Sequence, residues 1–497
     1  MKSKPTDQYL HYLEWDGLQD EFEFSESISR EHLPIVPTKI SVRRDENYRI
    51  AVNVIGKQDP EIDLNSFYDS RYSSKELFTE PFEVFGEEIK GVIKWVLSDC
   101  YLGSGRSYYE NDNEIFNFNL KSFRVERTIK TDKEPSWLTE WYINSSNPFL
   151  VLPRTTHRKK INEFIQIREI NGKSEEKFSG PRIEEVSGFD FAVIKYEKYN
   201  FIIHQIPKNF GPSWSTHSLG IEYRNEYGKI PESKERESIS EIISFIIGKH
   251  LLNCGHTIFD DDGYLIKQVA INPWGNDIRG QCEEPSIPPI KLHFDNEMTC
   301  IEKILPPLIS QYMALRDKLK LNEVLSRYWI AEQMPLGTNI PIFANGFEIL
   351  IKNWFKMNES KARTVYISKK EFDSRMIDIL PQIEKKFSDV DMKDRIIRRI
   401  NNSYNMSGNE TFELFLTEIG IKIGKIENAA IQARHEMIHN SIDETPQNIK
   451  KMVILSRAYR TFINRVMLKI LGYSGNYIDY SMVGHPNKSI FDVAGDA

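Results

Sequence analysis

The chain has 497 residues, of which 40% are hydrophobic and 28% charged, a composition typical of a folded, water-soluble protein with room for roughly two to four domains. It has no apolar run of the roughly 18–20 residues needed to cross a bilayer, no apolar stretch that would form a secretory signal, and only four scattered cysteines. These features argue against a membrane partner and a disulfide-stabilised secreted fold, and they predict a cytoplasmic location.

The net charge of −7 is unevenly distributed along the chain. Residues 351–475 contain 22 Lys and Arg against 15 Asp and Glu, a net +7, which leaves 43 against 57, a net −14, for the remainder. A basic C-terminal part on an acidic protein indicates a polyanionic partner for that part, although ordinary solvated helix faces would give the same mild excess.

Up to about residue 290 the sequence favours strands. Apolar and polar residues alternate with the period of a half-buried strand in four segments, which are 40–42, 48–54, 114–120 and 122–126. Residues 191–196 and 199–204 are predicted to form a pair of strands around a short turn. One strong amphipathic helix is predicted at 237–254, where five isoleucines and a leucine fall on one stripe. We therefore expect residues 1–290 to form a β-rich α+β domain.

Beyond residue 300 the hydrophobic period becomes helical. Helices are predicted at 301–329, 343–357, 369–387, 393–401, 410–423, 427–440 and 446–471. Thr445 suits the N-cap of the last helix, with Pro446 at its first position and Gly472 just beyond its end. The expected fold class is multidomain α+β, in which a polar, proline-rich boundary at 272–289 leads into an all-α domain of five to seven helices at 291–497.

The six residues from Arg434 to His439, near the end of the predicted penultimate helix, carry the main functional signal. They are Arg-His-Glu-Met-Ile-His, and this string has two chemical interpretations. From His435 onward it is His-Glu-x-x-His, the pattern of a zinc-dependent hydrolase. His435 and His439 would then face one side of a helix, with Glu436 beside them.

The zinc interpretation needs a third protein ligand, because a catalytic zinc is held by three side chains and a water. Residues 446–477 contain no Asp or Glu, and Asp443 and Glu444 follow the helix too closely for the usual geometry. Asp479 and His485 remain candidates, at a spacing that matches no familiar zinc site. The zinc-dependent hydrolase is therefore the alternative enzyme.

From Arg434 onward the string is Arg, a polar residue, a few variable residues and then His, in a helix followed by a short turn and a long last helix. This arrangement resembles the HEPN ribonuclease family over roughly the last 200 residues, one domain's length. The resemblance implies a helical bundle that forms a homodimer or higher homo-oligomer and cuts RNA without a metal or other cofactor. It implies that Arg434 and His439 are catalytic and that His435, Glu436 and Asn440 support them.

The residue types suit this chemistry. Cleavage by the 2′-hydroxyl of RNA needs a base, an acid and positive charge on the phosphorane. His439 titrates near neutral pH, and its place in the last helical turn favours the protonated form. Arg434 stays charged and presents two donors to a phosphate. Residues five apart on a helix diverge by about 140°, so a cleft shared by two copies is expected.

The order of the two parts, with an acidic β-rich region before the HEPN-like region, is similar to that of the ApeA-type antiphage proteins. This resemblance implies that residues 1–290 are a sensor or regulatory domain. It also implies a phage-encoded trigger acting through that domain, and abortive infection in which the released nuclease cuts host RNA. A third function remains open, a non-catalytic helical protein that binds RNA or another partner and in which the motif is structural.

Three further clusters are weaker functional candidates. His250, Cys254 and His256 have spacings that a metal can use, but a buried thiol is the commoner outcome for a cysteine at the end of an apolar helix. Residues 103–106, Gly-Ser-Gly-Arg, are expected to form a glycine-rich turn and match no phosphate loop. Residues 260–263, Asp-Asp-Asp-Gly, are expected to form a hairpin turn rather than a calcium loop.

Overall fold

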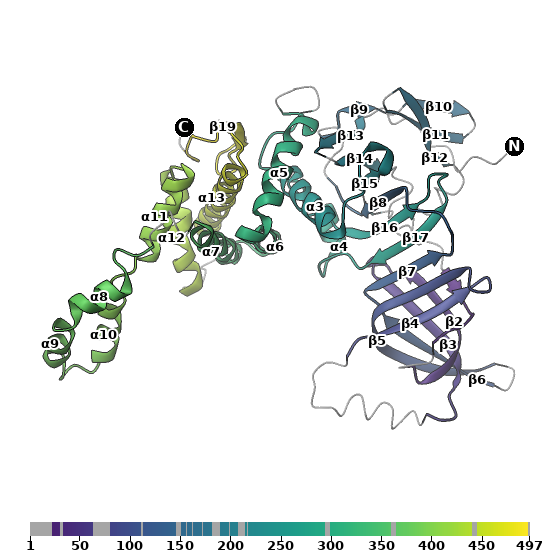
Figure 1. Cartoon of the computed structure of the whole chain (residues 1–497), viewed down its shortest axis with the longest axis horizontal. Coiled ribbons are helices and arrows are strands. Elements are labelled where there is room, and N and C mark those ends of the chain that lie inside the picture. Colours follow the sequence, from purple (N-terminus) through teal and green to yellow (C-terminus); the bar gives the residue numbers. More distant parts are fainter. Residues whose placement is uncertain are drawn as a thin grey trace. The chain divides into compact units, whose positions relative to one another are not determined.

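The computed structural model describes residues 22–495 of the chain, with internal gaps. The gaps are 30–32, 63–79, 111–112, 146–150, 156, 162, 171, 181–188, 198, 207–213, 216, 294–298, 359–363 and 440–444. The chain divides into two compact units, which we call the β unit (residues 1–288 and 292–307) and the helical unit (residues 289–291 and 308–497). The predicted order, a β-rich N-terminal part followed by a helical part, is confirmed (Figure 1).

The β unit is built on a 14-stranded antiparallel sheet. Its first strands are β1 (Phe22–Phe24), β2 (Ile35–Arg44), β3 (Ile50–Gln58), β4 (Phe82–Glu88), β5 (Ile93–Glu110), β6 (Asn113–Lys121) and β7 (Arg124–Ile129). The others are β8 (Trp137–Tyr142), β9 (Arg154–Thr155), β13 (Phe189–Tyr196), β14 (Tyr199–Ile206), β15 (Ser218–Arg224), β16 (Asn253–Phe259) and β17 (Leu265–Ile271). A separate three-stranded sheet contains β10 (His157–Ile161), β11 (Glu163–Ile170) and β12 (Lys173–Gly180).

The long strand β5 joins two regions of the large sheet. Its first half pairs with β7 and its second half with β6. Trp95, in the first half, is 1% exposed and stacks on Phe24 in the core of this region. The predicted glycine-rich turn at 103–106 is wrong, because these residues lie within β5. Gly105 is needed there for space, since a Cβ would collide with the ring of Phe118 on β6.

Three helical segments lie in the β unit. Both η2 (Asn225–Tyr227) and α3 (Ser233–Ile247) lie between β15 and β16 in the chain, and α4 (Ile278–Glu283) follows β17. The α3 helix ends at Gly248, which has φ 68°, so the predicted helix 237–254 starts and ends too late. The chain instead enters β16 at Asn253. The predicted hairpin turn after β16 is confirmed, because Asp260 accepts hydrogen bonds from the backbone N–H groups of Asp262 and Tyr264.

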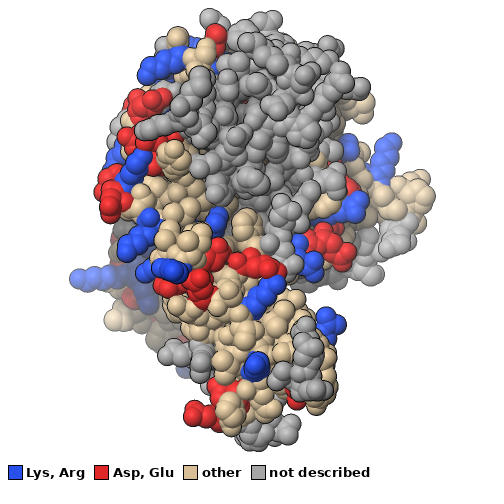
Figure 2. All heavy atoms as spheres, turned by 90° about the vertical axis from the view of Figure 1, so that its right-hand side faces the viewer, with Lys and Arg blue, Asp and Glu red and all other residues tan. Residues whose placement is uncertain are grey.

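The surface shown in Figure 2 carries charges of both signs. Among the residues that the structure describes on that face, Lys and Arg side chains are interspersed with Asp and Glu. These described side chains therefore form no patch of one sign that would attract a polyanion.

The helical unit contains more helices than predicted. It comprises most of α5 (Ile301–Leu319), and α6 (Leu321–Glu332), α7 (Asn339–Met357), α8 (Lys369–Met376), α9 (Ile379–Lys386), α10 (Lys393–Asn401), α11 (Gly408–Ile419), α12 (Lys425–His439) and α13 (Pro446–Ile470), with the hairpin β18 (Asn476–Ile478) and β19 (Asn487–Ser489). The predicted helix 301–329 is two helices, because Lys320 adopts a left-handed conformation with φ 54°. The predicted helix 369–387 is likewise divided into α8 and α9.

The core of the helical unit is centred on Phe347 of α7. Its ring lies 5.7, 5.6 and 5.1 Å, centroid to centroid, from Phe412 and Phe415 of α11 and Phe462 of α13. Helix α12 packs on both α7 and α13. Helices α8, α9 and α10 come between α7 and α11 in the chain and form a group of their own in Figure 1. No residue of α9 or α10 is buried. Along the described segments, no helix combines the length and apolar character needed to cross a membrane.

Candidate active site

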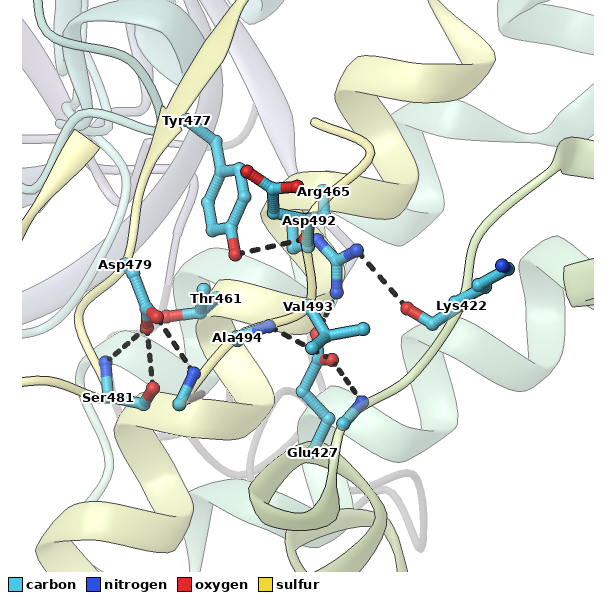
Figure 3. Close-up of polar contacts among 12 residues, drawn as sticks. Lys422, Glu427, Thr461, Arg465, Tyr477, Asp479, Ser481, Asp492, Val493 and Ala494 are labelled. Carbon is cyan, nitrogen blue, oxygen red and sulfur yellow. Dashed lines mark hydrogen bonds and ion pairs between the residues drawn. The ribbon is translucent and has the colours of Figure 1, made fainter. Parts of the chain in front are cut away.

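The first turn of α12, which carries the motif, is fixed by a buried ion pair. Glu427 is the third residue of the helix, and its carboxylate accepts a hydrogen bond of 2.9 Å from the backbone N–H of Gly424. The same carboxylate pairs with Nη1 of Arg465 on α13, and both side chains are 0% exposed. Figure 3 shows the two groups directed at each other. Since an isolated charge is costly inside a protein, each residue depends on the other.

The C-terminal segment contacts this ion pair. The backbone N–H of Ala494 donates to Glu427 at 3.3 Å, and that of Gly495 donates to Asp479 at 2.8 Å (Figure 3). The Arg465 guanidinium also donates to the backbone carbonyl of Lys422 at 3.2 Å. Burial raises the pKa of the Glu427 carboxyl group, and the positive charge of Arg465 opposes that rise. The start of α12 is therefore fixed by three partners of Glu427, which are the backbone N–H groups of Gly424 and Ala494 and the guanidinium of Arg465.

Arg434 lies two turns further along α12 and reaches α7. Its Nη1 forms an ion pair with Glu348, while its side chain remains 31% exposed and that of Glu348 57% exposed. Among the described residues, no other acceptor binds the guanidinium, so Nε and Nη2 remain available to a ligand. Tyr459 of α13 lies nearby, and burial raises the pKa of its phenol, which keeps it protonated at neutral pH.

Arg434 lines an open groove of about 840 Å³ in the helical unit. One wall is α7, with Glu348, Lys352 and Lys356, and α11 contributes Glu413. Helix α12 contributes Asn428, Gln432 and Arg434, and apolar side chains including Phe347 form much of the remaining lining. The groove lining therefore combines apolar side chains with polar and charged ones, as ligand sites commonly do.

The two motif histidines occupy positions on the last turns of α12. At 100° per residue, positions 435 and 439 lie about 20° on either side of Asn428 around the helix axis, and Asn428 lines the groove. Position 436 lies on the same helix, whereas Asn440 falls outside the described residues. The backbone thus places positions 435 and 439 at nearly the same angle as Asn428, about two and three turns further along α12, with Arg434 further round the same helix.

The side chains of His435, Glu436 and His439 lie outside the described part of the structure. Among the side chains that are described, no group of three His, Cys, Asp or Glu is placed to hold a metal ion. Asp479 accepts hydrogen bonds from Ser481 and Gly495 and pairs with Lys488 at 3.2 Å. Burial lowers the pKa of His250 to about 4 and that of His256 to about 3, so both are neutral at pH 7. Cys254, between them, is fully buried in β16, as expected for a structural thiol.

Glu348 is the site residue that the sequence did not predict. It is 86 positions from Arg434 in the chain, and no local pattern connects the two. Glu348 reaches Arg434 only because α7 and α12 pack together. The one sequence signal it leaves is its place on the polar side of the helical period of α7.

Comparison with known proteins adds no family assignment. No protein-family model matches the chain, and neither a curated protein nor a solved structure is significantly similar to it.

Proposed function

We propose that the protein is a metal-independent RNA endonuclease in which Arg434 and His439 are catalytic. The observation that carries the proposal is that Arg434 lines an open groove and, among the described residues, only its Nη1 is paired, on a helix that carries positions 435 and 439 at nearly the angle of Asn428. His435, Glu436 and Asn440 are assigned supporting roles. The likeness of Arg434-x4-His439 and its helical setting to the HEPN ribonucleases supports the assignment.

The reaction requires no group beyond these side chains and the RNA. A base removes the proton of the 2′-hydroxyl, whose oxygen attacks the neighbouring phosphorus while the bond to the 5′-oxygen breaks and an acid protonates that oxygen. The products carry a 2′,3′-cyclic phosphate and a 5′-hydroxyl. His439 serves a proton-transfer step, and Arg434 stabilises the charge on the phosphorane.

The active unit is at least a dimer. Arg434 and His439 diverge by about 140° on α12, so a phosphate contacted by Arg434 of one copy is better placed for His439 of a second copy across a two-fold axis. Mixing Arg434→Ala protein with His439→Ala protein should then restore part of the RNA cleavage that each variant lacks, because half of the composite sites in a mixed dimer are intact. A mixture that exchanges subunits and remains inactive would contradict the shared site.

Glu348 is assigned as a positioning residue for Arg434. Its carboxylate holds Nη1 and leaves the remaining donors for phosphate. Glu348→Gln should lower kcat for RNA cleavage roughly ten- to a hundredfold, since a small displacement of a catalytic group is costly. The KM for RNA should not rise, because a negative charge beside the phosphate is removed.

The matched control is Glu413→Gln, which removes the other groove carboxylate on α11. We expect it to leave kcat within a factor of about two of the wild-type value. An unchanged kcat in Glu348→Gln protein would remove Glu348 from the mechanism. Unfolding midpoints of both variants separate this effect from a loss of stability, because an exposed carboxylate contributes little to folding.

The cellular role we propose is antiphage defence by abortive infection in the cytoplasm, with the β unit sensing a phage-encoded trigger and releasing the nuclease. Two features support it, the likeness in domain order to the ApeA-type proteins and the division of the chain into two compact units. A separate unit that precedes a toxic enzyme in the chain is suited to holding that enzyme inactive.

A further inference from the structure

The α7 wall of the groove carries two lysines that the reaction described above does not use. Glu348, Lys352 and Lys356 are spaced four residues apart, so they follow one another along one side of α7. Four helical residues advance about 6 Å along the axis, which places the lysines roughly 6 and 12 Å beyond Glu348. Glu348 marks the position of Arg434, because the two side chains are paired.

Both lysines are exposed, and neither pairs with a carboxylate among the described residues. Among the described residues, the groove lining contains three cationic side chains, Arg434, Lys352 and Lys356, against two carboxylates. One of these carboxylates, Glu348, is already paired with Arg434, which leaves Glu413 of α11 to balance two lysines. A row of free cations that continues from the catalytic arginine is suited to successive phosphates of one extended strand.

We propose that Lys352 and Lys356 bind the backbone phosphates of single-stranded RNA next to the phosphate that is cut. This inference rests on the proposed nuclease function and adds the path of the substrate. The strand runs along α7, its phosphates lie against the two lysines, and its bases are directed to the apolar lining of the groove. Duplex RNA is disfavoured, because paired bases cannot enter an apolar groove.

The test is the salt dependence of RNA binding by the full chain carrying His439→Ala, so that binding is measured without cleavage. A fluorescently labelled single-stranded RNA of twelve nucleotides serves as the probe. Each phosphate contact on a single strand contributes about 0.7 to the slope of log K against log salt, so adding Lys352→Gln and Lys356→Gln should reduce the slope by about 1.4. In protein with an intact His439, the same pair should raise KM for RNA and leave kcat near the wild-type value.

The matched control is the pair Lys369→Gln and Lys370→Gln, which removes two charges from exposed lysines at the start of α8. It should leave the slope unchanged. An unchanged slope in the Lys352 and Lys356 pair, or an equal fall in both pairs, would overturn the assigned path. This outcome is distinct from failure of the nuclease proposal, which is decided by cleavage with and without His439 and not by binding.

Discussion

Replacement of His439 by alanine is expected to abolish RNA cleavage while leaving the helical unit folded. Removing a general acid or base typically costs about 10²–10⁴ in rate, and loss of a proton-transfer step should place activity at the lower limit of a gel assay. The measurement is the initial rate of cleavage of an end-labelled RNA by purified protein. Circular dichroism and the unfolding midpoint of the same sample establish that the fold is retained.

His485→Ala is the matched control for this variant. His485 belongs to the same unit, its ring lies 5.0 Å from that of Tyr480, and it is not among the described residues that line the groove. Its replacement should leave the cleavage rate unchanged. A well-folded His439→Ala protein that cuts RNA at the wild-type rate would remove this motif from the reaction.

Arg465→Met is expected to destabilise the helical unit by about 3–5 kcal/mol, because it leaves the Glu427 carboxylate buried without its partner. The measurement is hydrogen exchange of the backbone amides of α12 and α13, which reports on this unit separately from the β unit. The double variant Glu427→Gln/Arg465→Met should recover much of the loss, since no unpaired charge then remains in the interior.

The control is Arg375→Met on α8. Arg375 forms an ion pair with Glu371 at 2.7 Å, but the two side chains are 71% and 46% exposed, so its loss should cost no more than about 0.5 kcal/mol. If Arg465→Met and Arg375→Met changed the protection of α12 equally, the buried pair would not be the anchor of the motif helix. The same loss of anchoring should lower RNA cleavage in the Arg465→Met protein.

The sequence predicted elements best where local chemistry decides the structure. The last helix was predicted at 446–471 and is found at Pro446–Ile470, because Thr445 caps it and proline suits its first turn. Gly472, with φ 77°, lies just beyond its end. The break between α5 and α6 was missed, since Lys320 adopts its left-handed conformation without a glycine or proline to signal it.

The sheet could not be predicted to the same extent. Alternation identified β3, and β13 and β14 were predicted as a strand pair, but most pairing depends on partners far apart in the sequence. For example, β8 lies between β15 and β16, which follow it by about a hundred residues. The error at 103–106 has the same origin. Glycines that usually mark a turn are used here within β5, where the neighbouring strand approaches closely.

At the candidate site, too, the sequence predicted local features and missed contacts between helices. Arg434 and the histidines stand out because they are contiguous on one helix, and a short pattern suffices to select them. Glu348, Lys352 and Lys356 were not selected, because their proximity to Arg434 results from the packing of α7 against α12. The buried partner of Glu427 was missed for the same reason, since Arg465 resembles any other arginine in a long helix.

Metal-independent cleavage is tested by assaying RNA cleavage in the presence of a metal chelator, with zinc measured on the same wild-type sample. We expect protein without stoichiometric zinc to cut RNA at an undiminished rate and to leave 2′,3′-cyclic phosphate ends. Near-stoichiometric zinc that is lost on replacing His435, with activity that the chelator removes, would contradict this expectation and favour a zinc-dependent hydrolase. RNA that is bound but remains uncut would contradict it in favour of a binding protein.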